Sequence, residues 1–205
     1  MGTELNSATD EDAKSIKAFR AGDINAFNRL LEKYMDRIFN VCYRFLGDYE
    51  DAKDASQDVF LKVYDSLNKF RGDSSFYTWL YKITVNTCKN KLNSIEYRLF
   101  RKMGIIIKKD SLGKPNKNSL DEYIQNLPNG KPSPLTLLEY KEKELSIQRA
   151  INSLPPIQKI VVVLRDVEGF NYEEIAKITG LNTGTIKSRL FRARVRLRKK
   201  LEASL

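Results

Sequence analysis

Aromatic and basic side chains crowd together over residues 69–87, which read KFRGDSSFYTWLYKITVNT. Five rings this closely spaced are too many for the single buried stripe of one helix. Such residues are suited to binding a partner, and a Gly-Asp-Ser-Ser loop lies among them. The rings are Phe70, Phe76, Tyr77, Trp79 and Tyr81, and the cations are Lys69, Arg71 and Lys82.

Cations also dominate the end of the chain, where eight of them stand against the single acid Glu202 from residue 183 onward. A basic helix taken alone is as typical of a solvated surface as of a binding site. The whole chain, however, has a formal net charge of +10. This charge favours polyanionic partners, with nucleic acid first and an anionic membrane second.

Several classes of protein are disfavoured by what the sequence lacks. It contains no His, which removes Ser-His and Cys-His catalysis and the usual zinc ligands. Cys42 and Cys88 have no CxxC partner and are expected to be buried free thiols. No apolar run approaches the roughly 20 residues that span a bilayer, and the polar start does not resemble a signal peptide. We therefore expect a cytosolic protein that is not an enzyme, with no cofactor, no metal and no membrane insertion.

The elements that must position these residues are predicted to be helices. Apolar side chains recur at helical spacing before Gly47, over about 50–66 and again from about Phe76 past Asn90. Gly47 is expected to end the first of these helices, and Asp48 to cap the second.

Residues 99–135 differ, because they hold three glycines and four prolines. This composition is typical of a linker with one short helix near 119–126. The chain reads as helical again from about 136, with Pro155 and Pro156 suited to the start of a helix. The fold class is all-α, with two small helical domains joined by a flexible linker. The expected divisions are an N-terminal extension (1–23), a first domain (24–97), the linker (98–138) and a second domain (139–205).

The segment NYEEIAKITGLNTGTIKSRLFRARVRLRKKL carries the strongest local pattern. The small side chain of Ala176 permits a close helix approach, Gly180 supplies a turn, and Ile186 packs the following helix. Asn182 is placed to cap that helix, which is expected to begin at Thr183. This spacing predicts a helix-turn-helix, which turns the basic helix behind it into a candidate DNA reader.

Residues 154–198 resemble the promoter-recognition domain of bacterial sigma factors of the extracytoplasmic-function (ECF) group, and GTIKSRLFRAR is close to that group's signature. DAKDASQDVFLKVYDSLNKFRGDSSFYTWLYKITVNT, residues 51–87, resembles the group's other conserved domain. The resemblance implies that the first domain binds the β′ clamp helices of core RNA polymerase and opens the minus-ten element. It implies that the second reads the minus-thirty-five element and touches the β flap, while the linker threads through the polymerase. Many members of the group are held inactive by an anti-sigma factor, so we expect one here.

The resemblance assigns candidate residues to each surface. The acids of the second helix share one face. Composition alone favours a solvated acidic face, but the resemblance implies that this face meets the basic clamp surface. The residues for core polymerase are Asp51, Asp54, Gln57, Asp58 and Phe60.

For the minus-ten element, rings could stack on the bases of melted DNA and cations could hold its phosphates. The resemblance places Phe70 and Asn86 at the pocket for a flipped base. Asn86 could instead be a buried helix residue, Trp79 is as readily core as surface, and Leu80 and Ile83 are expected in the core. Phe70, Arg71 and Tyr77 are expected to be exposed. The minus-ten residues are Phe70, Arg71, Ser74, Tyr77, Trp79, Lys82 and Asn86.

For the minus-thirty-five element, Arg and Lys suit guanine edges and Phe suits thymine methyl groups. The base-reading residues are Thr185, Lys187, Ser188, Phe191 and Arg192. Arg194, Arg196 and Lys199 are expected at phosphates or in solvent.

Two other functions fit parts of the sequence. A conventional helix-turn-helix regulator would explain residues 154–198 but not 51–87, and would read duplex DNA without polymerase, commonly as a dimer. A nuclease would need carboxylates that converge on a metal, whereas the acids here line helix faces without metal-ligand spacing.

Overall fold

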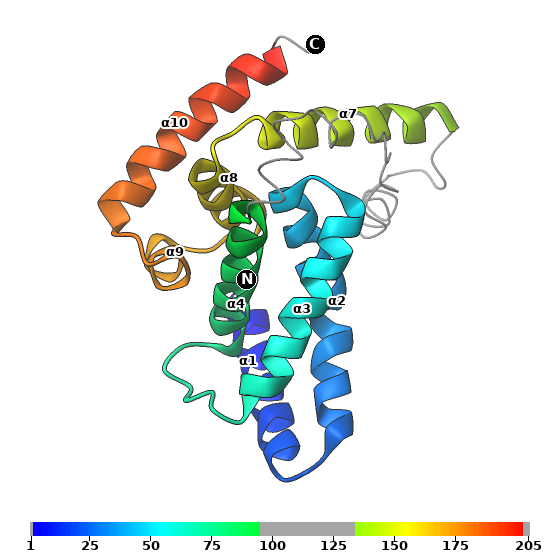
Figure 1. Cartoon of the computed structure of the whole chain (residues 1–205), viewed down its shortest axis with the longest axis vertical. Coiled ribbons are helices and arrows are strands. Elements are labelled where there is room, and N and C mark those ends of the chain that lie inside the picture. Colours follow the sequence, from blue (N-terminus) through cyan, green and yellow to red (C-terminus); the bar gives the residue numbers. More distant parts are fainter. Residues whose placement is uncertain (1, 95–133, 203–205) are drawn as a thin grey trace.

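The structure is a computed structural model, which describes residues 2–94 and 134–202, and every regular element in these ranges is a helix (Figure 1). The predicted all-α class is therefore confirmed for the described residues. Residues 98–133 of the expected linker, with the helix expected near 119–126, lie outside them, whereas residues 134–138, also expected in the linker, form the start of a helix. The helices are α1 (Gly2–Arg20), α2 (Ile24–Leu46), α3 (Tyr49–Leu67), α4 (Phe76–Asn93), α7 (Pro134–Asn152), α8 (Pro156–Val162), the π-helical η1 (Val163–Val167), α9 (Tyr172–Thr179) and α10 (Thr183–Glu202).

Helices α1 to α4 form an N-terminal unit in which α2 packs on the other three. Local sequence signals define its helix ends, as predicted. Gly47 ends α2 in the left-handed conformation with φ of 79°, and Asp48 caps α3 by accepting the Asp51 N–H. Ser75 caps α4 in the same way, which places the Gly-Asp-Ser-Ser loop directly before that helix.

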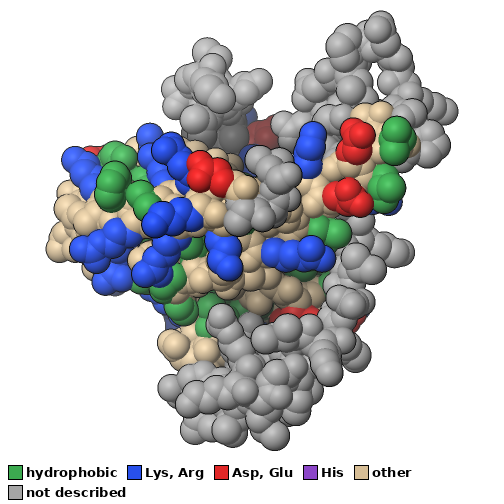
Figure 2. Space-filling view, turned by 90° about the horizontal axis from the view of Figure 1, so that it is seen from above, with side chains coloured by type: hydrophobic (Ala, Val, Ile, Leu, Met, Phe, Trp, Pro, Cys, Tyr) green, Lys and Arg blue, Asp and Glu red, His purple; other side chains and the backbone are tan. Residues whose placement is uncertain are grey.

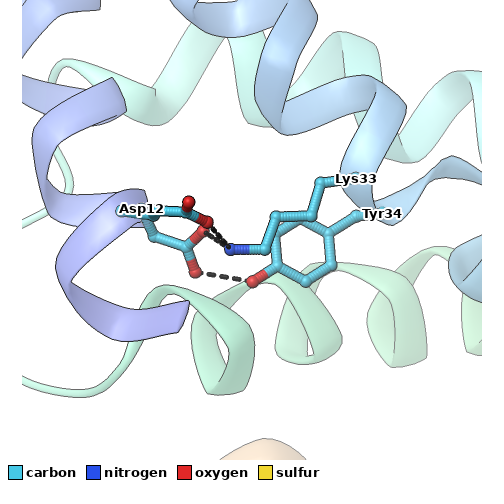
Figure 3. Close-up of polar contacts among 4 residues, drawn as sticks. Asp12, Lys33 and Tyr34 are labelled. Atoms are coloured by element: carbon cyan, nitrogen blue, oxygen red, sulfur yellow. Dashed lines mark hydrogen bonds and ion pairs between the residues drawn. The ribbon is translucent and has the colours of Figure 1, made fainter. Parts of the chain in front are cut away.

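Helix α1 occupies most of the segment expected as an N-terminal extension, and it is held by a buried polar contact (Figure 3). Asp12 is only 3% exposed, and its carboxylate accepts hydrogen bonds from Tyr34 Oη at 2.5 Å and Lys33 Nζ at 2.7 Å. Burial and the Asp12 carboxylate raise the pKa of Tyr34 far above its ordinary value. A buried carboxylate is stable only when it is paired in this way, so α1 is an integral part of the unit.

Helices α7 to α10, with η1, form a C-terminal unit. Pro156 opens α8, as its fixed φ favours. Gly180 ends α9 with φ of 74°, and the Asn182 side chain accepts the Thr185 N–H at 2.7 Å to cap α10. Ile186 is fully buried beneath the turn. The predicted helix-turn-helix is therefore confirmed.

The two units are packed against each other, with α9 on α4 and both α7 and α8 against α2 (Figure 1). Lys159 is 4% exposed, and its ammonium donates to the Phe45 carbonyl at 3.1 Å across the junction. A Cβ on Gly47 would lie 2.4 Å from the Asn152 amide nitrogen, so the approach there is very close. Buried side chains of both units form one continuous core. The sequence reading expected domains joined only through a linker, because helical periodicity does not reveal which apolar faces meet.

Cys42 and Cys88 are free and buried, as predicted, and their sulfur atoms lie 3.6 Å apart between α2 and α4. Within residues 2–94 and 134–202, no helix combines the length and the apolar composition that a membrane crossing requires.

Candidate functional site

The acidic face of α3 is only partly free. Asp51 is tied to α4, because Lys91 Nζ lies 3.0 Å from its carboxylate and donates to its carbonyl at 3.1 Å. Burial would lower the pKa of Lys91, but the hydrogen bond and charge of Asp51, with Asp54, raise it. Asp54 is 68% exposed and 3.6 Å from the same ammonium, and Asp58 is also exposed. Asp54 and Asp58 are therefore the acids best placed to meet a partner.

An apolar groove of about 740 Å³ lies between α2 and α3, and it shares Gln57 with a second pocket, between α3 and α4, that Asp54 and Asp58 line. Gln57 and Phe60, both predicted for partner binding, line the groove. Its rim is apolar and exposed, with Leu61 65% and Ile24 61% accessible. Sequence reasoning missed the other apolar lining residues of this groove. The apolar lining comprises Ile24, Phe27, Leu31, Met35, Phe39, Phe60, Leu61 and Tyr64. The sequence feature that could have indicated the groove is the apolar face of α2, which is wider than a single buried stripe needs.

Three of the residues predicted for the minus-ten element share one face of α4. Trp79, Lys82 and Asn86 recur at intervals of three and four, so they lie above one another on the helix. Lys82 and Asn86 are exposed, which excludes the buried role considered for Asn86. Trp79 is half-buried, and the half-buried Phe70 ring packs against it with centroids 5.0 Å apart. Leu80 is fully buried as expected, whereas Ile83 is only half-buried against the core.

The loop before α4 is held by α1. The Arg20 guanidinium donates to the carbonyl of Phe70 and to that of Leu67, the latter at 3.4 Å. Arg71 is exposed and Ser74 half-buried, with the Ser74 hydroxyl donating to the Ser75 carbonyl at 3.4 Å. The first helix thus orients the backbone on which the candidate pocket ring is mounted, a role that no residue pattern indicated.

The structure places Tyr77 away from the Trp79 face, against the expectation that it is exposed. Its ring stacks on Phe170 of the C-terminal unit at 4.9 Å, and its hydroxyl lies 3.2 Å from Tyr81 Oη and 3.4 Å from the Glu168 carboxylate. Burial raises the pKa of Tyr77 to about 12, and the Glu168 charge adds to that effect. Tyr77 and Trp79 are two residues apart, so their side chains leave the helix in directions that differ by roughly 200°. Tyr77 therefore points to the other unit.

Cations gather over α10 on the upper face of the molecule, with apolar side chains among them (Figure 2). Lys187, Ser188 and Arg192 are exposed, and Phe191 is 71% accessible on the same helix. An exposed phenylalanine among cations is unusual for a merely solvated helix, and this arrangement suits a groove that offers both phosphates and methyl groups.

Three residues of α10, one of them the exposed Lys187, also make contacts within the unit. Thr185 is half-buried, with its N–H on the Asn182 cap, so its backbone has a structural role. Lys187 Nζ lies 5.4 Å from the centroid of the Tyr172 ring. Arg194, expected at phosphate or in solvent, is exposed and also pairs with both Asp166 carboxylate oxygens at 3.1 and 2.5 Å. Arg196 and Lys199 are exposed as expected.

Comparison with protein families matches both units. The model described as "Sigma-70 region 2" matches residues 30–96, and that described as "Sigma-70, region 4" matches residues 144–197. The RNA polymerase sigma-H factor of Pseudomonas aeruginosa is 33% identical over 96% of this chain and 96% of its own length. The ECF RNA polymerase sigma-E factor of Escherichia coli is 33% identical over 93% of this chain and 94% of its own length.

Solved structures share the fold. The structure titled as CnrH in complex with the cytosolic domain of CnrY has a TM-score of 0.64 at 19% identity, and it covers 95% of this chain and 99% of that one. The Bartonella quintana sigma factor RpoE, crystallised with the anti-sigma factor NepR, has a TM-score of 0.56 at 23% identity, covering 87% and 98% of the two chains.

Proposed function

The chain belongs to the ECF group of RNA polymerase sigma factors, which bind core RNA polymerase and direct transcription initiation at promoters without being enzymes, and we propose a role in that process for each surface described above. Membership rests on both units and on nearly the whole chain. A conventional helix-turn-helix regulator would leave the N-terminal match unexplained, so that alternative is set aside.

The groove between α2 and α3 is proposed to receive the β′ clamp helices of core polymerase. The supporting observation is that Leu61 of α3 and Ile24 of α2 are exposed on the groove rim. The exposed acids Asp54 and Asp58 precede Leu61 by seven and three residues, so they lie on the same side of α3 as that leucine. An amphipathic helix lays its apolar face into such a groove. Basic residues on the clamp would then meet the acids and steer the encounter.

The outer face of α4 is proposed to hold the melted minus-ten strand. Phe70 and Trp79 offer ring faces, and Lys82 offers a cation for the backbone. The exposed amide of Asn86 is free to hydrogen-bond the edge of an extruded base, a contact that base-reading proteins use. Arg71 and Ser74 are included in this proposed surface, whereas Tyr77 is left out because its ring stacks on Phe170.

The exposed side of α10 is proposed to read the minus-thirty-five element through Lys187, Ser188, Phe191 and Arg192, with Arg196 and Lys199 at phosphates. Thr185 would act mainly by shaping the start of the helix. The division into an extension (1–23), a core-binding domain (24–97), a linker (98–138) and a promoter-reading domain (139–205) remains our proposal, as does a contact of the second domain with the β flap.

We also propose a cytoplasmic location and control by an anti-sigma factor. Polymerase and promoters lie in the bacterial cytoplasm. Two relatives of this fold were crystallised with protein partners, one of which is named an anti-sigma factor.

The groove assignment is tested by comparing two exposed leucines. Leu61→Glu places a charge on the groove rim, whereas Leu138→Glu makes the same change at a 53% exposed site on α7. We expect Leu61→Glu to lose co-purification with core polymerase and Leu138→Glu to retain it. Equal co-purification of both variants with wild type would remove the groove from the interface.

A further inference from the structure

Arg20 is an exposed cation at a well-defined helix end. It is the last residue of α1, and Gly22 follows with φ of 100°. The Gly22 N–H bonds the Phe19 carbonyl and the Asp23 N–H bonds the Ala18 carbonyl, each at 3.0 Å, and this pair of bonds closes a Schellman turn. The backbone from which the Arg20 side chain extends is therefore fixed by local hydrogen bonds.

Two further contacts hold α1 in place on the N-terminal unit. The buried Asp12 carboxylate accepts from Tyr34 of α2, as described above. In the turn that carries Arg20, the Phe19 ring packs edge-on against Tyr64 of α3, with centroids 5.4 Å apart. Arg20 is thus presented to the end of α3 by a helix that is itself anchored to the unit.

The Arg20 guanidinium binds the backbone where α3 passes into the loop before α4. Helix α3 ends at Leu67, and the carbonyls of a final helical turn lack partners within the helix. Arg20 donates to the Leu67 carbonyl at 3.4 Å and also to the Phe70 carbonyl. Its charge suits the negative end of the α3 dipole. One side chain thus supplies donors both to the end of α3 and to the loop that follows.

Phe70 is also held through its ring, by α4. The ring centroid lies 5.0 Å from that of Trp79 and 6.1 Å from that of Phe76, the first residue of α4. Helix α1 therefore bonds the Phe70 backbone while α4 contacts its side chain. Removing the Arg20 donors would release the first of these constraints and leave the ring contacts as the other.

We propose that Arg20 is a positioning residue for strand opening, which holds the Phe70 backbone so that the ring is already in place when a base leaves the minus-ten duplex. This inference rests on the proposed role of the outer face of α4. A loop that is ordered in advance does not have to be ordered at the moment of binding, which favours capture of the base. Arg20 acts through the Phe70 carbonyl and not by contact with DNA.

The placement of the loop is tested in the free chain through Trp79, its only tryptophan. Arg20→Met keeps a long side chain but removes the donors. Arg29→Met is the matched control, because Arg29 is exposed and pairs with Asp23 at 3.1 Å. We expect Arg20→Met to red-shift the Trp79 emission and to increase its quenching by acrylamide, and the control to match wild type. Unchanged emission and quenching in a fully helical Arg20→Met chain would overturn the positioning role.

Strand opening is tested with core polymerase by permanganate footprinting on a matched promoter duplex. We expect Phe70→Ala to lower opening about tenfold, as loss of one base stack does. Arg20→Met should lower it about threefold, as loss of a hydrogen bond does. Arg20→Lys keeps a cation and a donor, so it should recover part of that loss, and Arg29→Met should open as wild type does.

A double variant shows whether Arg20 acts through Phe70. Residues that act through one another have non-additive effects. Adding Arg20→Met to Phe70→Ala should therefore lower opening no further. Two losses that multiply would indicate a general structural effect of Arg20 and would overturn the proposal.

The same variants separate this inference from the proposed function. Wild-type opening by Arg20→Met, beside reduced opening by Phe70→Ala, would overturn the role of Arg20 and leave the pocket. Wild-type opening by Phe70→Ala would overturn the pocket on α4, and the role of Arg20 with it. All variants should co-purify with core polymerase. Loss of co-purification by Arg20→Met would place its effect on docking and would also overturn the proposal.

Discussion

The two units expose their binding residues in opposite ways. The N-terminal unit presents rings that are half-buried against one another, such as Phe70 on Trp79, beside an apolar groove. The C-terminal unit presents α10, a helix of cations with Phe191 71% exposed. The first surface combines apolar contact, which salt barely affects, with a few exposed acids beside it, whereas the second depends mainly on charge, which salt screens. We therefore expect salt to weaken promoter reading by α10 more steeply than docking on the groove.

The largest expected effect breaks docking while sparing reading. Asp54→Arg combined with Asp58→Arg replaces two exposed acids with like charges toward a basic clamp surface, which costs several kcal/mol across an interface. We expect loss of co-elution with core polymerase and normal binding of a minus-thirty-five duplex. Asp54 is mostly exposed and 3.6 Å from the half-buried Lys91, which keeps its closer partner Asp51, so the lost ion pair contributes little to folding and helicity should persist.

Its control is a charge reversal in the other unit. Glu173→Arg changes an exposed acid of α9 and should leave co-elution intact. If the double variant co-elutes as wild type does, the acidic face has no part in docking.

A smaller effect is expected within the N-terminal unit. Asn86→Ala should keep polymerase binding and minus-thirty-five recognition but slow strand opening and blur preference at one minus-ten base. The lost base-edge contact should cost on the order of 1–3 kcal/mol. Permanganate footprinting on a matched duplex, and base preference on a pre-melted bubble, measure the two parts. Because Asn86 is exposed, thermal stability should not change. Wild-type opening together with wild-type base preference would rule out a pocket role for Asn86.

The smallest effect sharpens the contrast in salt dependence. Lys199→Ala should weaken binding evenly across promoter variants and lower the slope of log affinity against log salt by about one. Arg194→Ala is the informative partner, because Arg194 is already paired with Asp166. We expect its removal to change that slope less. The slopes are measured by titration of a minus-thirty-five duplex at several salt concentrations. If Arg194→Ala lowered the slope more than Lys199→Ala, Arg194 rather than Lys199 would be the residue that contacts phosphate.

Local sequence signals predicted the parts of the fold that depend on neighbouring residues. Gly47, Asp48, Gly180 and Asn182 were placed correctly at helix ends, because a cap or turn needs only its own few residues. The exposed face of Asn86 also follows from helical spacing. The same geometry argues against placing Tyr77 on the exposed minus-ten surface, because Tyr77 and Trp79 lie on different faces of the helix.

Contacts between distant segments could not be predicted in this way. An apolar side chain reads the same whether it enters a core, as Phe45 does, or lines an open groove, as Leu61 does. Likewise, Glu168 reads as a surface acid until Tyr81 and Arg37 are brought to it from α4 and α2. For the same reason, the sequence predicted a linker between the domains but not the packing of one domain against the other.

Gly47 meets two independent demands at once. Its φ of 79° ends α2, and the absence of a side chain admits Asn152 from the other unit. The first demand alone would tolerate asparagine, which also adopts the left-handed conformation. The second disfavours any side chain while the units stay together, because the Asn152 amide, which accepts from Gln148 and Lys159, would have to move. Among members of the family, the residue at this position should therefore depend on whether the two units pack together. Where they do, glycine should be retained, and where they do not, asparagine should also occur.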